Sequence, residues 1–448
     1  SHENFPIGTE RIPEEVISAF AVLKKAAALA NMELGVLPES IGRYICLACD
    51  KVIAGEYNDQ FPVDVYQGGA GTSCNMNANE VIANVALELM GHRKGEYQYC
   101  HPNNHVNCSQ STNDVYPTAI RLALYATLTD FMGDMEYLRQ GFAAKAEEFC
   151  DVMKMGRTQM QDAVPMTLGM EFSAWATTIG EDIRRIGEGR EQICDISMGA
   201  TAIGTGINTP EGYAALVTKR LAEISSLPLF MAENLVEATS DCCAYVQISG
   251  LLKRFVVKLS KICNDLRLLS SGPCCGLNEI NLPPRQPGSS IMPGKVNPVI
   301  PEVVNQVCFN VIGNDVTITM AAEAGQLELN AMEPVIAYTL FASLKHLGNA
   351  CHILRDLCVD GITANREHCA SLVRNAIGVV TALAPYIGYE RSSEIAREAL
   401  ASGQSVYDLV VRHNYMTSEE IDYVLSPERM MQPGEDKELQ RRIAKRLG

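Results

Sequence analysis

Three long segments of this sequence are apolar with few prolines or glycines, and they limit the fold more than any other feature. They are Tyr116–Cys150, Leu227–Leu269 and Val299–Ala322. In the first, apolar side chains recur at three- and four-residue steps, for example at Ile120, Leu124 and Leu128, which is the period of an α-helix. Helices this long, with apolar residues on more than one face, need other helices around them. The sequence therefore predicts an all-α protein built on a helical bundle.

A further helix is predicted near the start of the chain. Pro13 is followed by Glu14 and Glu15, and proline and acidic residues both favour the first turn of a helix. Apolar residues then follow at helical spacing: Ile17, Phe20, Leu23 and Ala27.

Polar stretches rich in Gly, Ser, Thr and Asn separate the helical segments. They are 68–79, 103–114, 199–210 and 271–298. We expect these stretches to be loops that interrupt the bundle and carry most of the polar chemistry. After about Thr363 the sequence has more charge and shorter apolar runs, which predicts a small C-terminal domain.

Length and charge restrict the class of protein. A chain of 448 residues suggests two or three domains. The net charge of −16 argues against general binding of nucleic acid, because neutralising phosphates requires a surplus of Lys and Arg. A small dicarboxylate substrate is still compatible with this charge, since it needs only a local cationic pocket. No run approaches the ~20 apolar residues that span a bilayer, and no export signal opens the printed sequence.

The sixteen cysteines are interpreted as reduced thiols, so we expect a cytoplasmic protein. Several lie in apolar helical runs, where cysteine acts as a small hydrophobic residue. The pair Cys46 and Cys49 has no second pair at zinc-ribbon spacing. Cys100, His101, His105 and Cys108 form a second group with potential metal ligands, but we predict no metal site.

The most informative loop is 288–298, Gly-Ser-Ser-Ile-Met-Pro-Gly-Lys-Val-Asn-Pro. It combines two hydroxyls, an ammonium and an amide within a few residues. Three other segments accompany it in the sequence: 69–77, 105–114 and 156–159. Together, in their order and spacing, they resemble the signature segments of the aspartase/fumarase superfamily. The resemblance covers nearly the whole chain. The sequences of 278–283 and 320–327 are similar to those of the aspartase branch in particular.

The resemblance implies an architecture. It implies a mainly helical protomer of three domains with a long central helical bundle, for which we expect boundaries of 1–112, 113–366 and 367–448. It further implies a homotetramer in which loops of three subunits form each active site. No organic cofactor is expected, and activation by Mg²⁺ is left open because the sequence contains no dedicated carboxylate cage.

The resemblance also implies a reaction, the reversible elimination of ammonia from L-aspartate to give fumarate. The C3 proton of aspartate is removable only if the adjacent carboxylate is stabilised as an enediolate, which requires converging donors. Ser289 matches the family's catalytic base. The family positions that hold the carboxylate next to C3 carry hydroxyls here, namely those of Thr72, Ser111, Thr112 and Ser290. The α-carboxylate is assigned to Lys295, Asn297 and Thr158, and the ammonium to the amide oxygens of Asn113 and Gln159.

Two departures from the family and two alternatives accompany this prediction. Many relatives, including fumarases, have histidine where Gln159 stands, and the family commonly has arginine at the position of Cys274. The first alternative is a class II fumarate hydratase, which eliminates water from malate. The second is a non-catalytic structural or binding oligomer of the same fold. The presence of Ser289, Lys295 and Asn297 argues against the second alternative, because a silent scaffold needs none of them.

Overall fold

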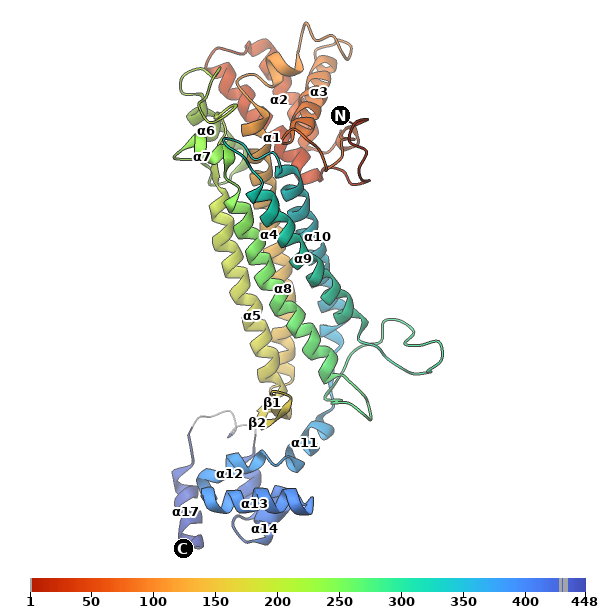
Figure 1. The fold of residues 1–448 in the computed structure, drawn as a ribbon, viewed down its shortest axis with the longest axis vertical. Coiled ribbons are helices and arrows are strands. Elements are labelled where there is room, and N and C mark those ends of the chain that lie inside the picture. The colour runs from red at the N-terminus through yellow and green to blue at the C-terminus, as the bar shows by residue number, and fades with distance from the viewer. Residues whose placement is uncertain (1, 427–428, 430–433) are drawn as a thin grey trace. The chain divides into compact units, whose positions relative to one another are not determined.

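The computed structural model describes residues 2–426, 429 and 434–448, and it is mainly helical (Figure 1). The predicted all-α class is confirmed. Contacts divide the chain into two compact units. Unit 1 comprises Ser1–Met135, Glu181–Val257 and Gln306–Asn349, and unit 2 comprises Glu136–Gly180, Lys258–Asn305 and Ala350–Gly448. The three-domain division at 112 and 366 stays a prediction.

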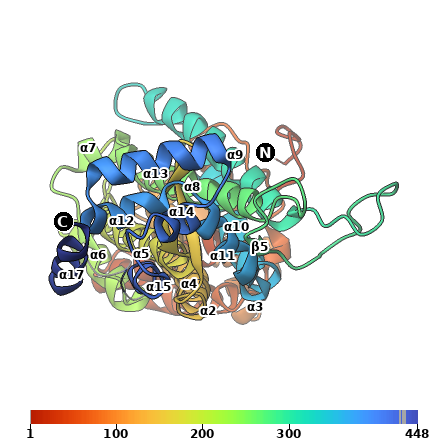
Figure 2. The same ribbon diagram turned by 90° about the horizontal axis from the view of Figure 1, so that it is seen from below.

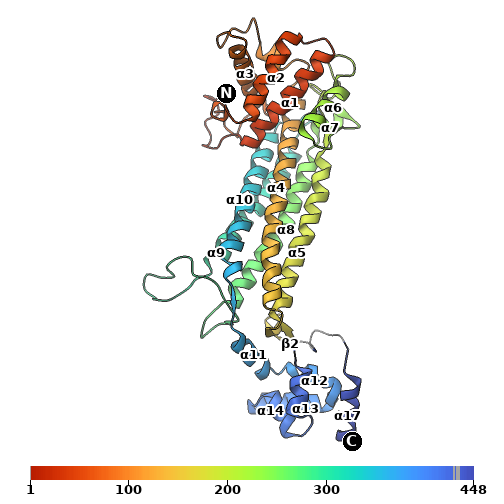
Figure 3. The same cartoon turned by 180° about the vertical axis from the view of Figure 1, so that it is seen from behind.

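Unit 1 contains a group of helices from the first third of the chain (Figure 3). α1 packs against α2, α3 and α6. α1 begins directly after Pro13, as predicted, and buries Ile17, Phe20 and Leu23. The helices that lie wholly in this unit are α1 (Glu14–Glu33), α2 (Glu39–Ile53), α3 (Thr72–Leu89), α6 (Tyr213–Ser225) and α7 (Leu235–Ser240), with the 3₁₀ turns η1 (Asn58–Gln60) and η3 (Glu191–Ile193) and the π-helix η2 (Pro102–Val106).

Five long helices can be followed in Figures 1 and 3. They are α4 (Thr112–Glu148), α5 (Leu168–Arg190), α8 (Cys243–Leu269), α9 (Val299–Glu323) and α10 (Glu333–Leu357), and each contributes residues to both units. α9 confirms the predicted helix at 299–322. α4 begins at Thr112, four residues before the predicted Tyr116, and contains Pro117 in its second turn.

Two sequence predictions about helix boundaries are wrong. Leu227–Leu269 is not one helix: the side chain of Asn234 accepts the N–H groups of Val236 and Glu237 and starts α7, and Asp241 is extended before α8. The predicted loops 68–79 and 103–114 are not entirely loop: α3 begins at Thr72, and the second stretch contains most of η2 and the first residues of α4. Gly71, at φ 90°, permits the sharp entry into α3, and a Cβ there would lie 2.2 Å from the ring of Tyr116.

The strands are short, as the sequence indicated. β1 (Met153–Thr158) and β2 (Gln161–Thr167) form an antiparallel hairpin in unit 2, with Thr158 opposite Gln161. β3 (Asp195–Ile196) pairs in parallel with β4 (Phe230–Met231), and β5 (Ile280–Asn281) pairs antiparallel with β6 (Thr363–Ala364).

The short C-terminal helices pack together in unit 2 (Figure 2). They share a buried apolar cluster that includes Leu383, Leu409 and Ile443. These helices are α11 (Arg366–Asn375), α12 (Val379–Ile387), α13 (Tyr389–Ser402), α14 (Val406–Arg412), α15 (Ser418–Val424) and α17 (Lys437–Leu447), and the 3₁₀ turn η4 (Val359–Gly361) precedes them in the chain. Within the described residues, no single helix could cross a bilayer, although the bent pair α11 and α12 passes on length and composition alone.

A buried polar cluster lies in the core of unit 1. The guanidinium of Arg121 pairs with Asp195 at 2.6 Å, and the thiol of Cys242 donates to Oε1 of Glu333. Burial raises the pKa of the Glu333 carboxyl to about 8, and the positive charge of Arg121 opposes the shift. Glu333 is therefore mostly protonated at neutral pH.

Replacing Glu333 by Gln tests this buried carboxyl. Because the folded pKa is raised above its ordinary 4.5, folding takes up a proton between these values. The carboxyl's contribution to stability is then complete below pH 4.5 and is lost as pH rises through 8. The slope in this window is about 1.4 kcal/mol per pH unit. Glu333→Gln lacks this loss, so the melting temperature of the variant should rise relative to wild type between pH 5.5 and 8.5.

The exposed Glu323 gives the control. The difference in melting temperature between Glu323→Gln and wild type should be independent of pH. Parallel melting curves for wild type and Glu333→Gln over the whole pH range would contradict a protonated Glu333.

Candidate active site

A completely buried lysine organises the polar loops of unit 1. Nζ of Lys24, on α1, donates to Asn75 Oδ1 at 2.7 Å, to Asn107 Oδ1 at 2.9 Å and to Gln110 Oε1 at 2.8 Å. Burial lowers the pKa of Lys24 to about 7, and the charge of Asp114 opposes the shift. Only an ammonium carries three N–H donors, so the three amide oxygens favour the protonated form. One cation thus joins α1, α3 and the loop before α4.

Asp114 fixes the start of α4. Its Oδ1 accepts the N–H of Ser111, and its Oδ2 accepts the N–H groups of Gly199 and Thr201, each at 3.0 Å. Burial raises the pKa of Asp114 to about 6, while these three hydrogen bonds favour the carboxylate. Ser111 Oγ accepts the N–H of Asn113, which completes a cap of the Ser-x-x-Asp kind.

The four predicted site residues of unit 1 lie at two helix starts. Thr72 is the first residue of α3, is exposed and donates to Gly69 O at 2.6 Å. Thr112 Oγ1 accepts from Asn75 Nδ2 at 3.0 Å. Asn113 donates through Nδ2 to Ala202 O at 2.7 Å, so its amide oxygen points away from that carbonyl. The hydroxyl of Ser111, although it caps α4, still has its O–H to donate.

Thr158 and Gln159 lie at the tip of the β1–β2 hairpin in unit 2, and both are exposed. The turn consists of Gln159 and Met160, which have φ values of 53° and 63°. Two consecutive left-handed residues define the primed turns of tight hairpins, which normally use Asn and Gly. A Gln-Met pair at this place is strained.

The segment between α8 and α9 projects from these helices in Figure 1, and the loop 288–298 is its last part. Asn297 Nδ2 donates to Gly288 O at 2.7 Å, which closes the loop at its base. A Cβ at position 288 would lie 1.5 Å from the carbonyl oxygen of Lys295, so glycine is required there. Ser289 is half-buried, and its Oγ accepts the N–H of Ile291 at 3.2 Å. Ser290 and Lys295 are exposed.

The predicted site residues therefore form three groups. One group belongs to unit 1, namely Thr72, Ser111, Thr112 and Asn113. The other two belong to unit 2, namely Thr158 with Gln159, and Ser289 with Ser290, Lys295 and Asn297. The roles of all ten residues stay predictions.

The supporting residues Lys24 and Asp114 were not predicted from the sequence. Lys24 follows Phe20 by four residues and precedes Ala27 by three, so it lies on the buried face of α1. A lysine in such a position is a signal for a buried cation. Asp114 was signalled by its spacing from Ser111, which is that of a capping box.

The cluster of Cys and His at 100–108 has a structural explanation. His101 Nδ1 accepts the N–H groups of Asn103 and Asn104, and His105 Nδ1 accepts the N–H of His101. Burial lowers the pKa of His105. Within the described part of the chain, no three His, Cys, Asp or Glu side chains are grouped as metal ligands.

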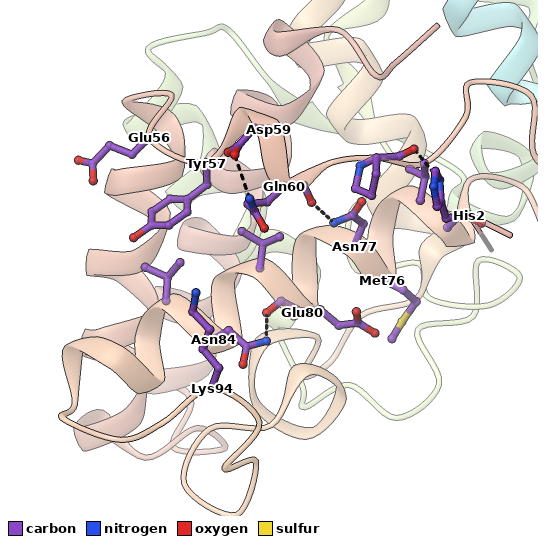
Figure 4. Close-up of a pocket in the computed structure, with 15 residues that line it drawn as sticks. His2, Glu56, Tyr57, Asp59, Gln60, Met76, Asn77, Glu80, Asn84 and Lys94 are labelled. Atoms are coloured by element: carbon purple, nitrogen blue, oxygen red, sulfur yellow. Dashed lines mark hydrogen bonds between the residues drawn. The ribbon is translucent and has the colours of Figure 1, made fainter. Parts of the chain in front are cut away.

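A cavity of about 680 Å³ in unit 1 lies outside the predicted site (Figure 4). Its lining includes Glu80 and Asn84 of α3, and Asn77, whose amide donates to Gln60 O. None of the ten predicted site residues is among the described residues that line it.

Comparison with known proteins identifies the family. Residues 2–313 match the family model described as "Lyase", and residues 379–432 match the one described as "Fumarase C C-terminus". The chain belongs to the aspartase/fumarase superfamily. An aspartate ammonia-lyase of Helicobacter pylori is 58% identical over 433 residues, which are 96% of this chain and 92% of that protein. One of Pseudomonas aeruginosa is 59% identical over 420 residues, 94% and 89% of the two chains.

Solved structures of the superfamily agree with the fold. A fumarate lyase/delta-crystallin from Brucella melitensis has a TM-score of 0.94 and 53% identity, over 96% of this chain and 94% of that one. A class II fumarase from Schistosoma mansoni has a TM-score of 0.90 and 34% identity, over 97% and 94%.

Lys24→Met tests the buried cation of this superfamily member. The substitution preserves an aliphatic side chain but removes the ammonium donor from Asn75 Oδ1 and Gln110 Oε1, and one of three donors from Asn107 Oδ1. This loss should cost about 3 kcal/mol or more of unfolding free energy. Backbone amides of residues 107–114 should also exchange hydrogen faster. Chemical denaturation and hydrogen exchange measure both effects.

The adjacent Lys25→Met is the matched control. Lys25 forms a surface ion pair with Asp50 at 2.6 Å, and such a pair contributes less than about 1 kcal/mol. Equal denaturation midpoints for the two variants would refute the role of Lys24.

Proposed function

We propose that this chain is an aspartate ammonia-lyase, which reversibly eliminates ammonia from L-aspartate to give fumarate. Relatives with this name match over nearly the whole chain at 58% and 59% identity. The observation in the chain itself that carries the proposal is Gln159 at the tip of the β1–β2 hairpin. Fumarases have a histidine at this position, and a glutamine amide cannot act as a proton donor in acid catalysis.

The leaving group explains the importance of Gln159. The hydroxyl of malate must receive a proton to leave, and a histidine with a pKa near ~6.5 is suited to supply it. The ammonium of aspartate leaves as ammonia without an acid. It needs acceptors instead, and the amide oxygens of Gln159 and Asn113 are suitable. The anchoring of Asn113 through its Nδ2 to Ala202 supports this role.

Ser289 is proposed as the base that removes the C3 proton. Its alkoxide must be stabilised by cations or N–H groups. The N–H of Ile291 already donates to Ser289 Oγ, which supports the assignment. The hydroxyls of Thr72, Ser111, Thr112 and Ser290 would donate to the substrate carboxylate next to C3 as it becomes an enediolate.

Three residues are assigned to the α-carboxylate of the substrate: Lys295, Asn297 and Thr158. Lys295 supplies a charge, while the other two supply neutral donors. Asn297 also closes the base of the loop through Gly288, so the residue that positions the loop would touch the substrate as well.

The assembly is proposed to be a homotetramer whose active sites each use loops of three subunits. This proposal rests on the resemblance of the loops that carry the predicted site residues to the signature segments of the superfamily. We further propose the domain boundaries 1–112, 113–366 and 367–448, and a cytoplasmic location. Within the described residues the sixteen cysteines form no disulfide bonds, which is typical of a reducing compartment. The proposed elimination uses no organic cofactor. None of its steps requires Mg²⁺, which is a candidate activator only.

The function is tested by comparing two substrates. L-Aspartate and L-malate are incubated separately with the protein, and the absorbance of fumarate is followed. We expect clear release of fumarate from aspartate and little or none from malate. Comparable turnover of malate would favour the fumarase alternative. No turnover of either substrate would favour a non-catalytic oligomer.

Ser289→Ala tests the base. Because the change deletes proton abstraction and little packing, the variant should fold normally and lose at least ~10²–10⁴-fold in kcat. Ser402→Ala, an exposed hydroxyl on α13, is the control and should keep full activity. More than about a tenth of wild-type activity in Ser289→Ala would exclude Ser289 as the base.

Sites shared between subunits predict complementation. Ser289→Ala and Ser111→Ala should each be inactive as homotetramers. Mixed tetramers should regain activity, because some sites then receive both intact serines from different chains. Activity is measured after denaturing and refolding the two variants together. Hybrid tetramers without recovered activity would indicate that each site lies within one subunit.

A further inference from the structure

Glu279 is a completely buried carboxylate in unit 2 that lies between two cations. Its Oε2 is 2.9 Å from Nζ of Lys154, and its Oε1 is 2.6 Å from Nη1 of Arg157. Both cations belong to β1. Lys154 is itself buried and also pairs with Glu171 of α5 at 2.5 Å. Two cations of β1 and two carboxylates thus form a balanced group beside the hairpin.

The attraction in this group is mainly Coulombic. Within the described structure, neither oxygen of Glu279 accepts a well-aligned hydrogen bond, although both lie at ion-pair distance from a cation. Loss of the Glu279 carboxylate would therefore remove the ion-pair partner of Arg157 and leave Lys154 with Glu171 alone, so that the two cations of β1 would be balanced by a single carboxylate. Like charges repel each other strongly where water is scarce.

The backbone of Glu279 is anchored to other elements of unit 2. Its N–H donates to Leu269 O at the end of α8 at 2.9 Å, and its carbonyl accepts the N–H of Asn365 at 2.9 Å. The thiol of Cys369, on α11, donates to the same carbonyl. These backbone bonds hold the Glu279 carboxylate in a fixed position, and its ion pairs with Lys154 and Arg157 attach the hairpin to it.

The hairpin needs this external support because its own geometry is unfavourable. Its tip is the strained turn of Gln159 and Met160. The register of the strands shifts between Met155 and Arg157, so the ladder is irregular next to the tip. Arg157, which Glu279 binds, is only two residues before Gln159.

We propose that Glu279 is a positioning residue that, through Arg157 and Lys154, fixes the hairpin presenting Thr158 and Gln159 to the substrate. This inference rests on the proposed function. Glu279 itself does not touch the substrate. The hairpin tip is strained and exposed, and the ion pairs of β1 with Glu279 determine where the side-chain amide of Gln159 points.

Glu279→Gln, which keeps the shape and removes the charge, tests the proposal in the full-length enzyme. We expect kcat/KM for L-aspartate to fall at least about tenfold, with KM raised because the ammonium acceptor is misplaced. Glu420→Gln is the matched control. Glu420 is also buried and pairs with Arg446 at 2.6 Å and Arg442 at 3.4 Å, so its loss should lower the melting temperature without changing KM.

A double-mutant cycle separates positioning from general destabilisation. If Glu279 acts through Gln159, then Glu279→Gln should lower kcat/KM by less than about threefold in a Gln159→Ala background. If Glu279→Gln does not fold, Arg157→Lys gives the same measurement, because it keeps the charge and loses the planar fork of the guanidinium.

The outcomes are distinct. Loss of activity that depends on Gln159 supports the proposal. Equal losses in both backgrounds, or kinetics like those of Glu420→Gln, overturn it while the proposed function stands. Failure of the wild-type protein to convert L-aspartate would instead overturn the function.

Discussion

The buried ammonium of Lys24 is the interaction on which the organisation of unit 1 depends. A charge removed from water is costly unless hydrogen bonds replace its hydration. Here three amide oxygens do so, and they come from residues 51, 83 and 86 positions further along the chain. Satisfying one cation therefore requires α1, α3 and the loop before α4 to meet. Thr112, the first residue of α4, follows this loop directly, and its hydroxyl accepts from the same Asn75 that binds Lys24.

Unit 2 uses the same principle with the opposite sign. A buried carboxylate, Glu279, lies between two cations of β1 and is held through its backbone by α8 and α11. In each unit, a fully buried charge binds a residue that adjoins a segment predicted to bind substrate. Lys24 binds Gln110, next to Ser111, and Glu279 pairs with Arg157, next to Thr158. Removal of one partner from such a group costs far more than the group contributes to net stability. The main effect of these groups is therefore to fix the positions of the neighbouring segments, and not to raise the net stability of the fold.

Much of the fold could be predicted because it depends on local patterns. Helical periodicity located α9 to within one residue, and the Pro-Glu-Glu start located α1. The division of 227–269 was missed because apolar content alone does not reveal a cap at Asn234. The start of α3 was missed because its first turns are rich in Asn and Ser. The signature loops supplied the candidate site residues, whereas Lys24 and Glu279 could not be assigned partners, since these are distant in the sequence.

The turn at Gln159 and Met160 shows why local preference and function disagree at one place. Asparagine and glycine would relieve the two left-handed residues. Glycine at 159 would remove the amide, and asparagine would hold it one methylene closer to the backbone. A glutamine there reaches further and supplies an acceptor without a titrating proton, which suits a leaving group that departs as neutral ammonia. The strain must then be offset by contacts elsewhere, and the ion pairs of Lys154 and Arg157 with Glu279 are positioned to do so.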